Sequence, residues 1–218
     1  AVQAARQNNA AKNIEYRVVD GFELPFEDAT FDLVVSFQVI EHIFDVAPYL
    51  KNICRVLKSG GTVIFTTPNA PIRLDPGMKP WNEFHVREFS SAELQALLAP
   101  WFSSVVVKGL FAEQALYDTE FQRVQRSKRN AQLKEQMKQQ ASWKLKRKLI
   151  EAAKAVLPRT FIDRSRRLLQ PAAQAPATGK PIEQDVLSRY STADFAYRTN
   201  DLDRALDLMA VCQRSSDS

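Results

Sequence analysis

Residues 20–43 bring two strand ends close together in the sequence, and this feature constrains the fold most. Segment 14–19 is rich in β-branched and aromatic residues and stops at Asp20, and 31–37 is a nearly continuous apolar run with polar residues after it. Such an apolar run predicts a strand that is buried on both faces of a sheet. Neighbouring strands with polar ends form a ligand crevice in an open α/β sheet. We therefore expect a binding crevice at the ends of these two strands.

Helices and strands alternate over the first hundred or so residues. The sequence predicts helices at 3–12, at 46–57 and from Ser90 onward, the second of them ended by Ser59-Gly60-Gly61, and further strands at 62–67 and 105–107. Strands separated by helices need crossover connections, which give a mostly parallel sheet. The predicted fold class is therefore α/β, with a Rossmann-like, mostly parallel sheet.

Beyond residue 116 the sequence changes character. Residues 117–170 are polar and helical in pattern, 171–181 form a Pro/Ala-rich linker, and 182–218 end the chain. In that last part we expect a strand at 194–198 and a short amphipathic helix at 202–209 that return to the core. The predicted organisation is a core at 1–116, a helical insertion, a linker and a C-terminal strand and helix.

The insertion carries the positive charge of the chain. Residues 123–148 contain ten Lys or Arg and one acid, against a net charge of +5 for the whole chain. Three interpretations remain open: a solvated helix face, a helix (123–150) on an anionic membrane surface or against a phosphate-bearing acceptor, and a nucleic-acid surface. The last is unlikely, because Trp143 is nearly alone as an aromatic among these charges.

The two cysteines, Cys54 and Cys212, show no metal-ligand spacing, and no run of eighteen apolar residues occurs. Reduced cysteines and the absence of a signal-peptide core favour a cytoplasmic protein, and peripheral attachment to the inner face of the membrane is the alternative. The first residue is Ala1, inside a helix-like segment. We expect a processed product or part of a longer chain. The sequence predicts no oligomeric state.

The order D-x-x-x-LPF-x-D-x-x-FD from Asp20, then VIEHI, RVLKSGG and TVIFTTPN, resembles class I S-adenosylmethionine-dependent methyltransferases over roughly residues 1–110. The resemblance implies a partial methyltransferase core with S-adenosylmethionine as the cofactor. By position in the motif it assigns the adenine to Asp20, Gly21 and Phe22. It likewise assigns the methionine portion and the methyl group to Ser36, Phe37 and Gln38. His42, with Glu41 beside it, is the candidate catalytic base.

Two departures from the family pattern affect these expectations. No G-x-G occurs among the six glycines, so the glycine-rich turn and two strands are expected upstream of Ala1. Some family members carry Glu-x-x-Glu-His at this point and bind a divalent metal, whereas this chain has Gln38 in the first position. A neutral amide is a poor ligand for a hard cation, and we predict no metal site.

The predicted function is methyl transfer from S-adenosylmethionine to a small-molecule, lipid-linked or glycan acceptor. The missing glycine turn supports an alternative of another class, a non-catalytic binding or scaffold protein that retains part of the fold.

Overall fold

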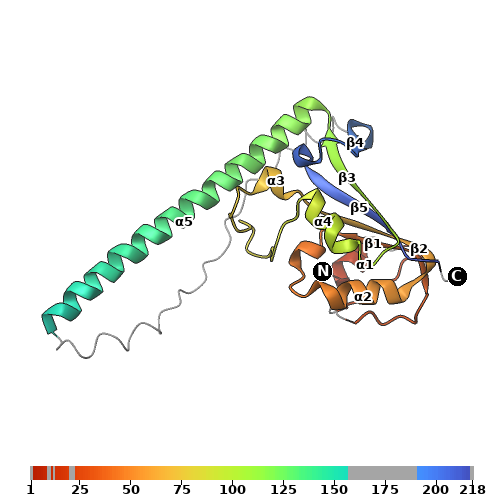
Figure 1. Ribbon diagram of the computed structural model, residues 1–218, viewed down its shortest axis with the longest axis horizontal. Coiled ribbons are helices and arrows are strands. Elements are labelled where there is room, and N and C mark those ends of the chain that lie inside the picture. The colour runs from red at the N-terminus through yellow and green to blue at the C-terminus, as the bar shows by residue number, and fades with distance from the viewer. Residues whose placement is uncertain (1, 9–10, 12, 20–22, 157–190, 217–218) are drawn as a thin grey trace. The chain divides into compact units, whose positions relative to one another are not determined.

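The computed structural model describes residues 2–8, 11, 13–19, 23–156 and 191–216. They form two compact units (Figure 1). The first comprises residues 1–125 and 195–218, and the second residues 126–194. Every site considered below lies in the first unit.

A five-stranded sheet forms the centre of the first unit. Its strands are β1 (Phe31–Phe37), β2 (Leu57–Pro68), β3 (Ser104–Ala112), β4 (Phe195–Arg198) and β5 (Asp207–Gln213), in the order β1-β2-β5-β3-β4. β1 and β2 are parallel, and β5 runs antiparallel to both β2 and β3, so β1, β2 and β3 point the same way. The predicted α/β class is confirmed. The prediction of a mostly parallel sheet is correct for the direction of these three strands. Among the described strand pairs, however, only β1 and β2 are hydrogen-bonded in parallel.

The helix predicted at 202–209 is wrong. Leu202–Arg204 forms one turn of 3₁₀ helix (η3), and the chain then enters β5 between β2 and β3. Leu208, Ala210 and Cys212 are buried at every second position, which is the period of a strand. β2 and β3, which lie far away in the sequence, both form backbone hydrogen bonds with this segment. That pairing overrides a locally helical pattern.

The strand predicted at 14–19 is also wrong, because these residues form no ladder and are irregular. Strand composition alone therefore does not make this segment a strand. β1 lies at the edge of the sheet and pairs with β2 alone.

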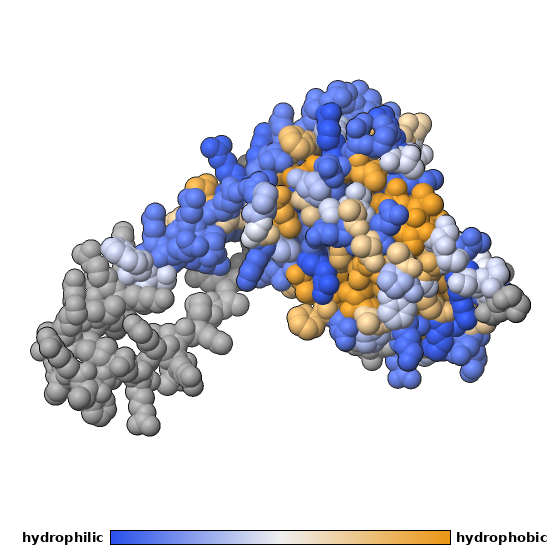
Figure 2. All heavy atoms as spheres, in the orientation of Figure 1, coloured by the Kyte–Doolittle hydropathy of each residue, from blue (hydrophilic) through white to orange (hydrophobic). Residues whose placement is uncertain are grey.

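The prediction that the strand at 31–37 is buried on both faces is wrong as well. Leu33, Val35 and Phe37 are each more than half exposed, while Ser36 on the opposite face is buried. Among the described residues, the helices therefore cover this strand on one side only. Figure 2 shows that hydrophobic side chains gather on the surface of the body that contains the sheet.

Gly60 and Gly61 do not end a helix as predicted. The helix α2 (Val46–Val56) passes directly into β2, and both glycines lie within that strand. Gly60 has a φ of +71°, and the register with β1 shifts at this point, so the pair forms an irregularity in the ladder. A Cβ on Gly61 would lie 2.8 Å from the carbonyl oxygen of Lys58, which explains why this position needs glycine.

Two helices pack on the sheet to make the core. α2 begins at the N-cap Asp45, whose side chain accepts a hydrogen bond from the amide of Ala47, and it buries Tyr49, Leu50 and Ile53. α4 (Ser91–Leu98) begins at the predicted position, with a capping box between Ser90 and Glu93. Both helices contribute to one hydrophobic cluster around Phe65. The shorter helices are α1 (Val2–Asn8), η1 (Ile40–His42), α3 (Ala70–Arg73) and η2 (Thr192–Asp194).

The long helix α5 spans Gln114–Val156, which confirms that the insertion is helical up to that residue. Its first turns belong to the first unit, where Gln125 donates a hydrogen bond to the carbonyl oxygen of Ile72 (3.1 Å). The rest of the predicted insertion and the linker at 171–181 lie outside the described residues. Within the described part of the chain, no helix is both long and apolar enough to cross a bilayer.

Gly109 offers a test of how tightly the C-terminal segment packs on β3. A Cβ at this position would lie only 2.4 Å from the Cβ of Ala205. We expect Gly109→Ala to lower the free energy of unfolding by about 1–3 kcal/mol, because overpacking a rigid contact forces the backbone apart. Urea unfolding followed by circular dichroism measures this. Ser104→Ala, at an exposed position of the same strand, should change stability by less than about 0.5 kcal/mol; equal effects of the two substitutions would contradict the packing argument.

Candidate functional site

A cavity of about 370 Å³ lies where β1 and β2 end. Gln38, directly after β1, and Pro68, the last residue of β2, contribute to its wall, together with Asp207 at the start of β5. Its remaining lining residues are Arg73, His85, Leu110, Glu120, Arg123, Val124, Phe195 and Leu206. Two arginines and two carboxylates make this a polar site, and its volume suits a small molecule.

Gln38 adopts a backbone conformation that residues other than glycine rarely adopt. Its φ is +54°, in the left-handed region, and its amide donates to the carbonyl oxygen of Thr66 on β2 (3.0 Å). Its side-chain amide donates to Oδ2 of Asp207 (3.5 Å). Such strained residues cluster at ligand sites, where the surrounding structure holds them in place. The turn therefore directs the Gln38 side chain toward Asp207, in the wall of the cavity.

Asp207 is the titratable group of the cavity with the largest departure from its ordinary behaviour. Burial raises its pKa to about 6, and nearby Glu120 and Glu41 act in the same direction, while Arg73 and Arg123 oppose them. A carboxyl group with such a pKa exchanges its proton near neutral pH, as a general base requires. Asp207 was not predicted from the sequence, because its neighbours come from three distant parts of the chain, around residues 38–41, 73 and 120–123.

The three residues predicted beside the methyl group, Ser36, Phe37 and Gln38, point in different directions. The Ser36 hydroxyl is buried and shares a short hydrogen bond with the Tyr49 hydroxyl, whose pKa burial raises to about 12. Phe37 lies on the open face of the sheet and is 59% exposed. Of the three, only Gln38 lines the cavity. Asp20, Gly21 and Phe22, the predicted adenine site, lie outside the described residues.

The loop at 82–89 is fixed on the turn that follows β1. The amide of Val86 donates to the carbonyl oxygen of Glu41 (2.8 Å), and Arg87 donates to the carbonyl oxygen of Phe44 (2.9 Å). His42 Nδ1 is 2.8 Å from the carbonyl oxygen of Phe84. His42, the predicted base, does not line the cavity. It packs edge-on against the ring of His85, which does, with 4.8 Å between the ring centroids.

A buried ion pair supports this loop from within. Arg73 Nε donates to Oε2 of Glu88 (2.9 Å), and Oε1 of Glu88 is 2.8 Å from Nδ1 of His85. The side chains of Glu88, His85 and Arg73 are 0%, 7% and 10% exposed. The guanidinium of Arg73 also lies over the ring of Trp81, with 4.3 Å to the centroid. The His85–Glu88 spacing of three residues was visible in the sequence, but its burial was not.

Glu41 is fully buried between the turn and β2. Its Oε2 accepts a hydrogen bond from Thr67 Oγ1 (3.2 Å), whereas its Oε1 has no hydrogen-bond partner. Oε1 lies 3.9 Å from Nε2 of His42. A buried carboxylate oxygen without a partner is costly, and such an atom in a native structure needs an explanation.

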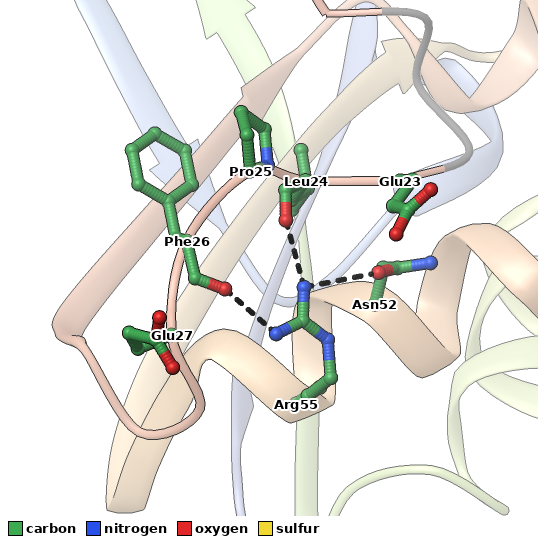
Figure 3. Close-up of a pocket in the computed structure, with 7 residues that line it drawn as sticks. All are labelled: Glu23, Leu24, Pro25, Phe26, Glu27, Asn52 and Arg55. Atoms are coloured by element: carbon green, nitrogen blue, oxygen red, sulfur yellow. Dashed lines mark hydrogen bonds between the residues drawn. The ribbon is translucent and has the colours of Figure 1, made fainter.

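A second cavity, of about 470 Å³, surrounds the turn at Leu24-Pro25-Phe26 (Figure 3). Arg55 on α2 donates to the carbonyl oxygens of Leu24 (2.8 Å) and Phe26 (2.7 Å), and further to Asn52 and Asp28. The guanidinium is thus engaged in holding the turn against α2. We assign this cavity a structural role.

Residues 1–65 match the family described as "Methyltransferase domain". A probable S-adenosylmethionine-dependent methyltransferase of Mycobacterium tuberculosis is 44% identical over 98 residues, which cover 44% of this chain and 35% of that protein. The human mitochondrial ubiquinone biosynthesis O-methyltransferase is 48% identical over 59 residues, or 27% of this chain and 16% of that protein.

Among solved structures, an S-adenosylmethionine-dependent methyltransferase from Mesorhizobium loti has a TM-score of 0.40 and 20% identity, and the match covers 50% of this chain and 60% of that one. The chain spans about a third of the length of the mycobacterial relatives that it matches.

Proposed function

We propose that this chain, whose first 65 residues belong to the class I S-adenosylmethionine-dependent methyltransferase family, supplies the acceptor side of a methyl-transfer site. The observation that carries the proposal is the polar cavity at the ends of β1 and β2, with Gln38 and Asp207 in its wall. In open α/β sheets, ligands bind outside the carboxyl ends of the strands.

The residues at the end of β1 fit the cofactor that the family uses. The open face beside Phe37 offers an aromatic ring, 59% exposed, next to the strained turn at Gln38. The cofactor supplies a sulfonium-bound methyl group. Asp20, Gly21 and Phe22 remain the proposed adenine contacts, and Ser36 acts through Tyr49 to fix the end of the strand.

The acceptor that best suits the cavity is a small polar molecule with a hydroxyl group. Arg73 offers donors to a negatively charged or carbonyl-bearing substituent, and the ion pair of Arg123 with Glu120 adds a further donor and acceptor to the wall. S-adenosylmethionine would supply the methyl group for the acceptor oxygen, and the carboxylate of Asp207 would accept the proton that the acceptor hydroxyl loses. The relatives include two proteins named O-methyltransferases and two named N-methyltransferases, so the oxygen nucleophile is proposed from the cavity and not from their names. Lipid-linked and glycan acceptors are further members of the same chemical class.

Cofactor binding tests the proposal directly. We expect the full-length product of the gene that encodes these residues to bind S-adenosylmethionine in a calorimetric titration, and Asp20→Ala to weaken that binding. Removal of a charge-assisted hydrogen bond costs about 1.5–3 kcal/mol, or roughly 10- to 150-fold in affinity. Glu15→Gln, at an exposed site nearby, is the control.

A scaffold without catalytic activity is the second candidate. If the calorimetric titration of the full-length protein with S-adenosylmethionine shows no heat of binding, the scaffold is supported and the methyltransferase proposal is rejected. Binding that Asp20→Ala leaves unchanged would reject the adenine assignment alone.

A further inference from the structure

We propose that Asn69, the residue directly after β2, is a positioning residue for the acceptor cavity. Its side chain fixes the segment 202–206, which leads into Asp207, to the end of β2. Two hydrogen bonds make this connection, and they join positions that lie 133 and 136 residues apart in the sequence. The catalytic part of this role rests on the proposed function, whereas the hydrogen bonds themselves do not.

The side chain of Asn69 donates two short hydrogen bonds inside the core. Its Nδ2 donates to the carbonyl oxygens of Leu202 and Ala205, both at 2.7 Å. Asn69 and Ala205 are 0% exposed, so water cannot replace these hydrogen bonds. Both partners only accept, which fixes the amide with its nitrogen toward the segment 202–206. Among uncharged side chains of this size, only an amide offers two N–H donors on one nitrogen.

The side chain of Asn69 does not cap its own helix. Asn69 is the N-cap residue of α3, a position at which asparagine is preferred because its side-chain oxygen accepts a hydrogen bond from the first turn. Here the side chain makes no such hydrogen bond, and its Oδ1 is buried without a hydrogen-bond partner. The side chain therefore serves the contact with the distant segment rather than the usual local one.

The ladder between β2 and β5 ends at Asp207. Its last pair is Pro68 with Asp207, and proline has no N–H to donate to the partner strand. On the side of β3, the amide of Leu206 donates to the carbonyl oxygen of Leu110 (2.9 Å). The hydrogen bonds of Asn69 therefore hold the residues before Asp207 from the side of β2, where Pro68 has no donor.

The backbone of Asn69 connects two further walls of the cavity. It forms an isolated bridge with Phe89, at the end of the loop that carries His85. Arg73 lies at the end of α3, which begins directly after Asn69. One buried residue thus connects the segments that carry Arg73, His85 and Asp207, three side chains in the cavity wall.

Asn69→Ala is expected to move the segment 202–206 toward water, because two buried carbonyl oxygens would otherwise stay without a donor. The carboxyl group of Asp207 would then lose part of its burial, which is the main cause of its raised pKa. The pKa of Asp207 should therefore fall from about 6 toward the ordinary value of 3.8. The charged and titratable groups near Asp207 or across the cavity from it are unchanged in this variant; they are Glu41, Arg73, His85, Glu120, Arg123 and Tyr197.

Carboxyl ¹³C NMR of the chain labelled at aspartate, without S-adenosylmethionine or any acceptor, measures this pKa separately from methyl transfer. The signal that Asp207→Asn removes identifies Asp207. Asn69→Ser, whose hydroxyl keeps one donor, should lower the pKa less than Asn69→Ala, and it decides the question if the alanine variant does not fold. Two controls should leave the pKa of Asp207 unchanged. Asn200→Ala removes an exposed hydrogen bond to Asp201, and Leu98→Ala weakens the core at a fully buried position outside the cavity.

In the full-length enzyme, Asn69→Ala should lower kcat/KM by roughly 10²-fold, the effect of a misplaced catalytic group. The rise of kcat/KM with pH should also move from about pH 6 to lower pH, in step with the pKa of Asp207. A merely structural role for Asn69 would lower the midpoint of thermal unfolding and leave this pH profile unchanged.

Two results would overturn the proposal. One is a pKa of Asp207 that stays near 6 in the folded Asn69 variants, and the other is a shift in Leu98→Ala as large as in Asn69→Ala. If the pKa falls as expected but the full-length protein does not bind S-adenosylmethionine, the positioning of Asp207 by Asn69 stands and the methyltransferase proposal fails.

Discussion

Replacing Arg73 by methionine is expected to lower the free energy of unfolding by about 3–5 kcal/mol. Arg73 pairs with the carboxylate of Glu88, and both side chains are at most 10% exposed. Methionine fills much of the same volume but leaves the Glu88 charge buried with only His85 beside it. Breaking a buried pair from one side costs this much, because the remaining charge has lost its partner and cannot reach water. Urea unfolding followed by tryptophan fluorescence measures the loss, and Trp81, which stacks on Arg73, reports it locally.

Lys58→Met provides the matched control. It also removes the cation of an ion pair, with Asp32, but these two side chains are 46% and 83% exposed. We expect a much smaller loss than for Arg73→Met, because solvent screens exposed ion pairs. If the two variants lose the same amount, the burial of the Arg73–Glu88 pair has no energetic consequence. The loop that presents His85 would then need another explanation for its position.

The features that could be predicted from sequence are those set by neighbouring residues. The strand at 31–37 has the bounds that its apolar run predicts, and the capping box at Ser90 and Glu93 marks the start of α4. The helix at 46–57 was recognised from its apolar stripe, because burial on one face leaves a 3.6-residue period in the sequence.

The errors come from pairing between distant segments. The start of β5 was predicted as the end of a helix because Leu202, Leu206 and Met209 have helical spacing, but its pairing is decided by β2 and β3, which lie far earlier in the chain. The segment at 14–19 has strand composition but does not pair with the outer edge of β1, so composition alone misled. Neither outcome is visible in a local window of sequence.

The candidate site likewise contains residues that could be predicted from the sequence and residues that could not. Gln38 was found because it follows a strand, whereas His42, the predicted base, does not line the cavity. Asp207, Arg73 and the unpaired oxygen of Glu41 were not found, because their significance depends on burial and on neighbours that only the folded chain brings together. The predicted roles of Asp20, Gly21 and Phe22 lie outside the described residues and stay predictions.

Replacing Asp207 by asparagine is expected to change stability and activity in opposite directions. Burial raises the pKa of this carboxyl group from 3.8 to about 6 in the folded chain. The folded state therefore holds the proton more tightly than the unfolded state. The resulting stability is fully present below about pH 4 and is lost as the pH rises through about 6, a total of about 3 kcal/mol for a shift of about two units. Asparagine does not titrate, so the variant should lack this decline and be the more stable protein at pH 7.

Chemical denaturation at pH 4, 5, 6 and 7 measures this difference. Asp203→Asn, at an exposed position four residues earlier, should behave like the wild type at every pH. The stability difference between the wild type and Asp207→Asn should grow from pH 4 to pH 7. If it does not grow, burial does not raise the pKa of Asp207 in the folded chain.

Activity should respond in the opposite sense. If Asp207 accepts the proton of the acceptor hydroxyl, kcat/KM of the full-length enzyme rises with pH through about 6, and Asp207→Asn lowers it by about 10²- to 10⁴-fold, the usual contribution of a general base. A carboxylate that serves only packing would leave the pH profile and kcat unchanged. The partly buried carboxyl group of Asp207 weakens the fold at neutral pH. A functional role that requires its charge explains why an acid occupies this position. The cavity shared by Gln38, His85 and Asp207 is where that charge would be used.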